Sequence, residues 1–273
     1  MTLFSVCPPV LFAYGPPLVE AAAHNDLAQV QTLLRQGEDP NLAGFDGTMA
    51  LMHATRHQNI DMIRSLLEKG ADIHLADRSG NPLLTNSGAT SDPAIISLFL
   101  DHGLPVNASY DRGKTPLMIM AHNGHTQAVQ VLLARGANIN ATDEEGMTPL
   151  HYAIAGYGRN ATISNLLSQG ARVNSARTDG TTPLMDASRQ GRADFVEMLI
   201  QKGADVNAQD KRGETALIAA VRMGRTSIVK ALLSHGASVT TTGKRDGATA
   251  LSIAEAAQAT SILQLLREAG ARP

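Results

Sequence analysis

The sequence has few of the residues on which many kinds of functional site depend. Its 273 residues include one cysteine and no tryptophan, and aromatic residues make up only 3%. A lone Cys7 forms neither an internal disulfide nor a Cys/His set for structural zinc, so we expect no metal site. Few aromatic rings leave few platforms on which bases or sugars can stack. We therefore expect a core of Ala, Leu, Ile, Val and Met, and no cofactor.

Charge of one sign and long apolar runs are also scarce. The 23 basic and 25 acidic residues nearly cancel, giving a formal net charge of −2. This balance supplies no broad positive field, so no nucleic-acid partner is expected. No apolar run approaches the roughly 18 residues of a membrane-spanning helix, so no membrane span is expected. The hydrophobic fraction of 43% is too high for a disordered chain.

Residues 1–15 carry no charge and contain Phe4, Phe12 and Tyr14. This segment is either an export signal that lacks its basic start or an extension that covers the open end of the fold. No Lys or Arg precedes the apolar run and no Ala-x-Ala pattern follows it. The extension is therefore the preferred interpretation, with a cytoplasmic location, and export to the periplasm or medium is the alternative.

An internal repeat dominates residues 16–273. One glycine series precedes Thr-Pro-Leu-like tripeptides: Gly47, Gly80, Gly113, Gly146, Gly180, Gly213 and Gly247. A second series follows Leu-Leu pairs or their equivalents: Gly37, Gly70, Gly103, Gly136, Gly170, Gly203, Gly236 and Gly270. Both series advance by 33 or 34 residues, which predicts eight repeats. Their approximate bounds are 16–43, 44–76, 77–109, 110–142, 143–176, 177–209, 210–243 and 244–273.

Each repeat contains the signals of a turn followed by two helices. In the fourth, Gly113 suits a turn with positive φ, Thr115 suits a helix N-cap, and Pro116 suits the first helical position. Residues 128–133 are apolar at helical spacing, and Gly136 ends that second helix. Neither helix can bury its apolar face alone, so the repeats must stack.

The repeat resembles the ankyrin repeat, most clearly at Thr148-Pro149-Leu150-His151-Tyr152-Ala153. The resemblance extends over about residues 16–273 and implies an all-α repeat solenoid, a stack of helix–turn–helix units with projecting β-turn fingers. It also implies that a partner lies against the finger tips and the exposed side of the first helices.

Three departures from the pattern predict local differences. The first helix of repeat three contains Gly88 and poor helix formers, so it should be short. Repeat five has one extra residue around 155–158, and the finger before repeat eight has one within 240–244. At the end of repeat eight, Gln264, Arg267 and Glu268 suit a solvent-facing cap.

Chemical motifs are weak. Gly156–Ala161 has the letters of a dinucleotide fingerprint but follows a helix beginning at Thr148, which predicts an inter-helix loop. His53 and His57 have a metal-binding spacing but no third ligand, so we prefer one packed and one exposed histidine. His151 matches the structural helix-start histidine of the family. We expect no catalytic, cofactor-binding or metal-binding residues.

The predicted surface offers a partner protein two kinds of contact. Finger tips carry mixed charge, whereas the first-helix ends carry no acid and predict a mildly basic inner groove. Phe45, Tyr110, Tyr157 and Met223 are the predicted apolar contacts, although Tyr110 is equally explained as a scaffold residue. The candidate partner-binding residues are Phe45, Arg56, His57, Arg78, Arg112, His122, Asn123, Tyr157, Arg189, Gln190, Arg212, Arg222 and Met223.

The sequence therefore predicts a monomer that binds an unidentified protein through a concave groove and finger tips and catalyses no reaction. Two alternatives remain. One is a regulatory protein that contacts nucleic acid, which salt-sensitive retention would reveal. The other is an enzyme with a pocket at repeats three to five, which would need two titratable side chains within hydrogen-bond reach.

Overall fold

The computed structural model describes residues 15–74, 83–86, 92–244 and 247–272. The chain forms two compact units that divide between Pro105 and Val106, and each is described by itself. In the described residues the regular structure is helical, apart from isolated bridges at Ala43–Met49 and Thr242–Thr249. The predicted all-α repeat solenoid is confirmed.

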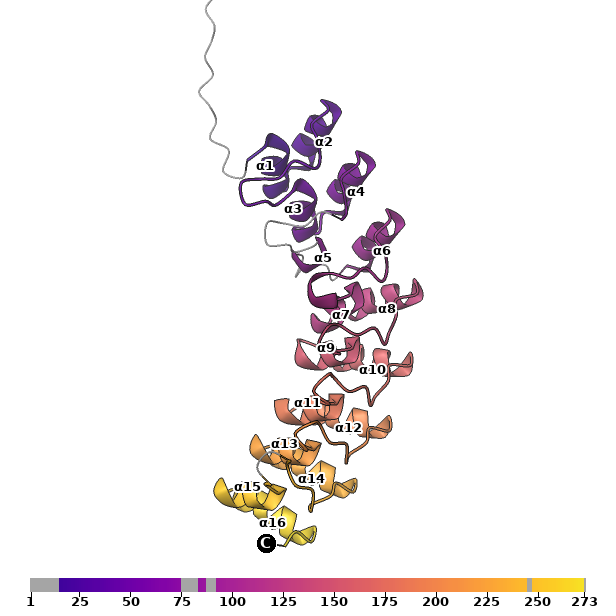
Figure 1. Ribbon diagram of the computed structural model, residues 1–273. Helices are drawn as coiled ribbons and strands as arrows, with labels where there is room; N and C mark the ends of the chain where they lie inside the picture. Colours follow the sequence, from indigo (N-terminus) through magenta and orange to yellow (C-terminus); the bar gives the residue numbers. More distant parts are fainter. Residues whose placement is uncertain (1–14, 75–82, 87–91, 245–246, 273) are drawn as a thin grey trace, which may run out of the picture. The chain divides into compact units, whose positions relative to one another are not determined.

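The first unit contains three pairs of helices (Figure 1). In chain order they are α1 (Pro17–Ala23), α2 (Leu27–Arg35), α3 (Ala50–Arg56), α4 (Ile60–Glu68), α5 (Leu83–Asn86) and α6 (Pro93–Asp101). Each first helix packs on the first helix of the next pair, α1 on α3 and α3 on α5, while α2 packs on α4 and α4 on α6. First and second helices therefore form two separate layers.

The second unit repeats this arrangement with five pairs and a short 3-10 turn, η1 (Asp111–Gly113). Its helices are α7 (Pro116–His122), α8 (Thr126–Ala134), α9 (Pro149–Ala155), α10 (Asn160–Ser168), α11 (Pro183–Gln190), α12 (Ala193–Gln201), α13 (Ala216–Arg222), α14 (Thr226–Ser234), α15 (Ala250–Ala256) and α16 (Thr260–Glu268). The odd-numbered helices pack on one another in order, as do the even-numbered helices. Figure 1 shows the two rows side by side.

Threonine caps fix where the first helices begin. The Thr115 hydroxyl accepts the Met118 N–H, with Pro116 at the first helical position. Thr148 caps α9 and Thr182 caps α11 in the same way. The hydroxyl satisfies an N–H that has no partner within the helix, and proline has none to satisfy. The predicted helix start in repeat four is confirmed.

Small and aliphatic side chains fill the space between the layers. Leu132 in α8 and Leu166 in α10 are completely buried, as are Phe99 in α6 and Phe195 in α12. Gly136, with φ of 87°, ends α8 in the left-handed conformation, as predicted. Because adjacent repeats share these side chains, each repeat depends on its neighbours for its core.

Backbone hydrogen bonds join the fingers of the second unit into a row. Each runs from an N–H to a carbonyl of the preceding finger: Glu144 to Arg112 (3.1 Å), Thr178 to Glu145 (2.9 Å), Lys211 to Asp179 (2.9 Å) and Lys244 to Arg212 (2.6 Å). Gly180 has a φ of 89°, and a Cβ there would lie 2.9 Å from the Asp210 Cα. Glycine is thus required both by the turn and by the close approach of the next finger.

Asparagines in the tails add a second link between repeats. Asn174 donates from Nδ2 to the Gly203 carbonyl at 3.1 Å, and its Oδ1 accepts the Asp205 N–H at 2.8 Å. Asn41, Asn107, Asn140 and Asn207 make the equivalent pair of bonds. These bonds hold neighbouring repeats in one register.

Two of the three predicted irregularities fall in the described part of the chain. In repeat three the structure describes the first helix, α5, only over Leu83–Asn86, and Gly88 lies outside the described residues, so the predicted shortness of this helix stays a prediction. Residues 156–159 connect α9 to α10, one residue more than 123–125 between α7 and α8. The extra residue of the last finger falls within 240–244. The same segment contains Thr242, which forms the isolated bridge with Thr249.

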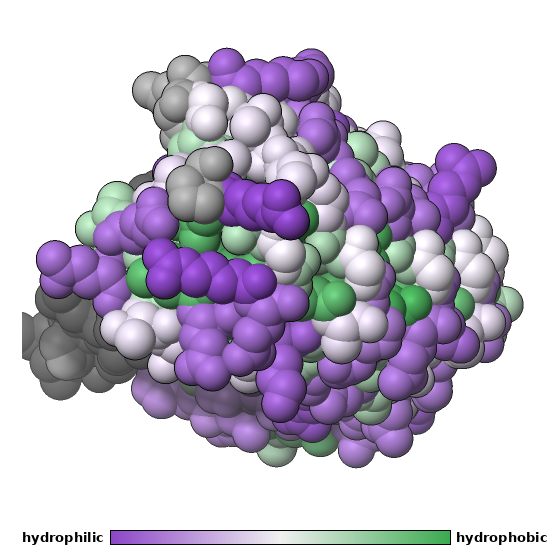
Figure 2. Space-filling model, turned by 90° about the horizontal axis from the view of Figure 1, so that it is seen from below, coloured by the Kyte–Doolittle hydropathy of each residue, from purple (hydrophilic) through white to green (hydrophobic). Residues whose placement is uncertain are grey.

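The predicted polar cap of repeat eight is confirmed. Gln264, Arg267 and Glu268 are exposed. Gln264 donates to Glu268 at 2.9 Å, and Arg267 pairs with Glu255 of α15 at 3.4 Å. Figure 2, which looks onto this end of the chain, shows hydrophilic side chains around and across a hydrophobic band. Polar groups thus limit the apolar surface that the last repeat exposes.

Candidate interaction surface

Three of the four predicted apolar contacts are exposed. Tyr157 is 80% exposed, Phe45 66% and Met223 48%. Tyr110 is half-buried, and burial raises its pKa to about 12, which favours its role in the scaffold. Leu42, which the sequence analysis did not single out, is 45% exposed. Its register gave no signal, because the described residues at the same position in later repeats, such as Ala108 and Ala141, are half-buried.

The two histidines of α3 have different surroundings. His53 is buried, its Nε2 lies 3.0 Å from the Thr48 hydroxyl, and burial lowers its pKa. His57 is exposed, but its Nε2 lies 2.8 Å from the Ala23 carbonyl. One packed and one exposed histidine were predicted. Across the described part of the chain, no cluster of three His, Cys, Asp or Glu side chains suits a metal ion.

The remaining basic candidates differ in their exposure and ion pairing. Arg56 and Arg212 are exposed. Arg112, at φ of 57° in η1, pairs with Glu145 of the next finger. Arg78 lies outside the described residues.

Tyr157 belongs to a group of rings at the ends of α7 and α9. The His122 ring lies edge-on to Tyr152 and Tyr157, at centroid distances of 6.2 and 6.0 Å. The Tyr152 hydroxyl donates to Asp143 Oδ2 at 2.7 Å, and burial together with this carboxylate raises the Tyr152 pKa. Tyr152 is thus held from both sides, and Tyr157 remains the exposed member.

The extra residue of repeat five explains why Tyr157 protrudes. The Tyr157 N–H donates to the His122 carbonyl at 2.7 Å. Glycine flanks it on both sides, because a Cβ at Gly156 would collide with His122 and one at Gly158 with the Ala153 carbonyl. The segment therefore lies tightly against α7 and its own helix, with the tyrosine ring in solvent. It follows helix α9, so the dinucleotide-binding interpretation stays rejected.

A chain of alternating charges lies on repeats six and seven. Arg177 and Arg189 both pair with Asp186, the latter at 3.3 Å. Arg189 also reaches Glu214 at 2.9 Å, and Glu214 meets Arg222 at 3.4 Å. The Arg189 guanidinium is held from two directions, by Asp186 and Glu214, and is therefore more ordered than that of an isolated surface pair.

This chain of charges shows that acids accompany the arginines of the predicted basic groove. The first-helix ends contain no acid, but Asp186 lies earlier in α11 and Glu214 precedes α13, and both reach the arginines. Burial raises the Asp186 pKa, against the lowering by Arg177 and Arg189. Three arginines against two acids leave a surplus of one positive charge. Comparison of equivalent positions missed the acids because they come from other positions of the repeat.

The ends of α7, α9, α11 and α13 lie in equivalent positions of consecutive repeats. We call their exposed side the first-helix face of the second unit, formed by His122, Asn123, Tyr152, Tyr157, Arg189, Gln190, Arg222 and Met223. Gln190 and Met223 are exposed, while Asn123 is half-buried at the end of α7. The face joins one aromatic group to one charged cluster on a fixed backbone.

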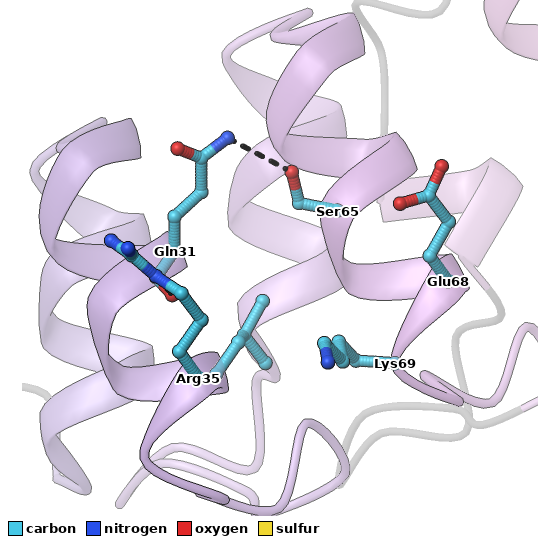
Figure 3. Close-up of a pocket in the computed structure, with 6 residues that line it drawn as sticks. Gln31, Arg35, Ser65, Glu68 and Lys69 are labelled. Atoms are coloured by element: carbon cyan, nitrogen blue, oxygen red, sulfur yellow. Dashed lines mark hydrogen bonds between the residues drawn. The ribbon is translucent and has the colours of Figure 1, made fainter.

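Clefts lie on the opposite side, between second helices. In the first unit an open cleft of about 340 Å³ separates α2 from α4, where Gln31 donates to Ser65 at 3.3 Å (Figure 3). In the second unit a cleft of about 390 Å³ separates α8 from α10. It is lined by Gln130, Leu133, Ala134, Asn165 and Gln169, none of which titrates. The expected sign of an enzyme pocket, two titratable groups in contact, is not found in this cleft.

The fold and this face define a helical repeat protein with a pre-formed surface. A family model for ankyrin repeats in three copies matches residues 18–109, 86–177, 154–210 and 184–273. The chain belongs to the ankyrin repeat family. No curated protein matches the sequence. In the described ranges, no helix is both long and apolar enough to cross a membrane.

Proposed function

We propose that this chain is a non-catalytic module that binds a partner protein on the first-helix face of the second unit. Ankyrin repeats generally mediate protein–protein interaction. The finger row and the tail asparagines hold this face in place before a partner arrives. A surface ordered in advance loses little conformational entropy on binding, which favours affinity.

One observation carries the proposal: Tyr157 is fixed by its backbone and yet is the most exposed large apolar side chain described. Its N–H donates to the His122 carbonyl, two glycines hold its loop against the scaffold, and the residue is 80% exposed. Exposed tyrosines on rigid backbones are frequent anchors of protein interfaces.

Quantitative capture of partners from the native cell tests this proposal. The variant Tyr157→Ala/Met223→Ala should weaken retention of the principal partner by about tenfold or more. The matched control, Gln130→Ala/Lys230→Ala, removes exposed side chains from second helices and should retain the partner as the wild type does. Both should melt as the wild type does, because surface truncations change stability little. Equal retention by the two variants contradicts the proposal.

A further inference from the structure

In the finger of repeat seven, the acidic side chain of Asp210 faces inward and the neighbouring basic side chains face solvent. Asp210 is buried, and its Oδ1 accepts the N–H groups of Arg212 and Glu214, both at 2.8 Å. The neighbouring Lys211 and Arg212 are exposed, as is Lys244 of the next finger. The acid stabilises the turn while the cations face solvent.

Two further acids, Asp186 in α11 and Glu214 just before α13, are likewise engaged. Asp186 is buried between Arg177 and Arg189, and the Glu214 side chain is 17% exposed between Arg189 and Arg222. In the part of the chain that the structure describes, no salt bridge joins these acids to Lys211, Arg212 or Lys244. The described residues of the finger of repeat seven, together with Lys244, therefore present positive charge to solvent.

The backbone fixes these three cations relative to one another. The Lys244 N–H bonds to the Arg212 carbonyl at 2.6 Å. A Cβ on Gly213 would lie 2.9 Å from Lys244 Cγ, so the lysine stem covers that glycine. We call Lys211, Arg212 and Lys244 the basic finger cluster.

We propose that the basic finger cluster binds an acidic segment of a partner protein, rich in Asp and Glu. The inference rests on the proposed function and adds the chemistry of the partner. Complementary charge speeds docking and fixes its register, and three exposed cations complement a run of carboxylates.

The rest of the finger row favours a protein over a nucleic acid. Asp179 is exposed beside Lys211, and Glu144 and Glu145 are exposed in the finger of repeat five. A nucleic acid carries a charge at every phosphate, so its backbone would meet these carboxylates as it continued along the row. A protein segment can place acidic residues at the cluster and neutral or basic residues beyond it.

Fluorescence anisotropy with the full chain tests this inference. The probes are two labelled peptides of equal length, one rich in Glu and one rich in Lys, and a single-stranded DNA of the same charge as the Glu peptide. The wild type should prefer the Glu peptide, with affinity that falls as salt rises. The variant Lys211→Glu/Arg212→Glu/Lys244→Glu should bind the Glu peptide about tenfold or more weakly and should prefer the Lys peptide.

The control Arg64→Glu/Arg172→Glu/Lys230→Glu makes the same change in net charge at exposed positions elsewhere. It should keep the wild-type preference. If the reversed variant misfolds by circular dichroism, Lys211→Gln/Arg212→Gln/Lys244→Gln replaces it and should lose most of the preference for Glu.

Three results would overturn the inference: tighter binding of the DNA than of the Glu peptide, an equal loss in the control, or no preference in the wild type. If any of them occurs while Tyr157→Ala/Met223→Ala still abolishes partner capture, the acidic partner is excluded and the proposed function stands. If partner capture is also unaffected, both proposals fail.

Discussion

Repeats three and four carry different residues at the position where the first helix is capped. Thr115 caps α7, which spans seven residues. The residue 33 positions earlier is Pro82, which has no hydroxyl to accept an N–H, and the structure describes the helix that follows it over Leu83–Asn86, as α5. Their second helices, α6 and α8, are both nine residues long. The two repeats therefore differ in the residue available to cap the first helix, while their second helices have the same length.

Within the second helix that the two repeats have in common, the largest effect should come from Leu132→Ala. Leu132 is completely buried in α8, and its truncation should lower the free energy of unfolding by about 2–5 kcal/mol. Urea denaturation measures this loss. Gln130→Ala, on the exposed side of the same helix, should cost much less, and a similar cost for both would contradict the place of Leu132 in the core.

The comparison extends to repeat five through His151, which occupies the register of Met118 in repeat four. Burial, followed by the charge of Arg177, lowers the His151 pKa to about 4. Between the ordinary value of 6.5 and about 4, the unfolded chain binds a proton that the folded chain does not. The contribution of His151 to the free energy of unfolding is therefore fully present above pH 6.5. About 3 kcal/mol of that free energy is lost as the pH falls toward 4.

The variant His151→Met isolates this contribution, because methionine does not titrate. The difference in unfolding free energy between wild type and variant should be constant above pH 6.5. Below that pH, the wild type should lose stability relative to the variant. A constant difference down to pH 4 would mean that the histidine titrates normally in the folded chain.

A smaller effect is expected from Thr115→Ala, which removes the cap that distinguishes repeat four from repeat three. The Met118 N–H loses its acceptor, so stability should fall by about 1 kcal/mol. Thermal unfolding measures the loss, and restoration of stability by Thr115→Ser would assign it to the hydroxyl. No loss on removing the hydroxyl would mean that the Thr115 cap does not stabilise repeat four.

The smallest change in stability is expected from Arg222→Ala. Arg222 is 42% exposed and shares Glu214 with Arg189, so its loss should change the free energy of unfolding by less than about 1 kcal/mol. Binding to the partner should nevertheless weaken. Unfolding of the variant with binding intact would assign Arg222 to the scaffold and remove it from the first-helix face.

Much of the first-helix face could be predicted from the sequence because the repeat specifies register. Tyr157 and Met223 lie at the ends of first helices, and both are exposed as expected. The pairing of Arg189 with Glu214 could not be predicted, because it joins residues 25 positions apart whose approach depends on how adjacent repeats pack. The same holds for His57, whose partner is the Ala23 carbonyl of the preceding repeat.

The sequence by itself determined the repeat, the helix starts and the turns, because these depend on contacts between residues near one another in the chain. Threonine, proline and glycine act locally, and the period of 33 or 34 residues multiplies their effect. Only the tertiary structure decided that Asp210 faces inward while Lys211 and Arg212 face solvent. The hydrogen bonds of Asp210 are local, since Arg212 and Glu214 lie two and four residues further along the chain. Its burial also depends on the preceding finger, whose Gly180 approaches Asp210 closely, and that approach exists only when the repeats stack.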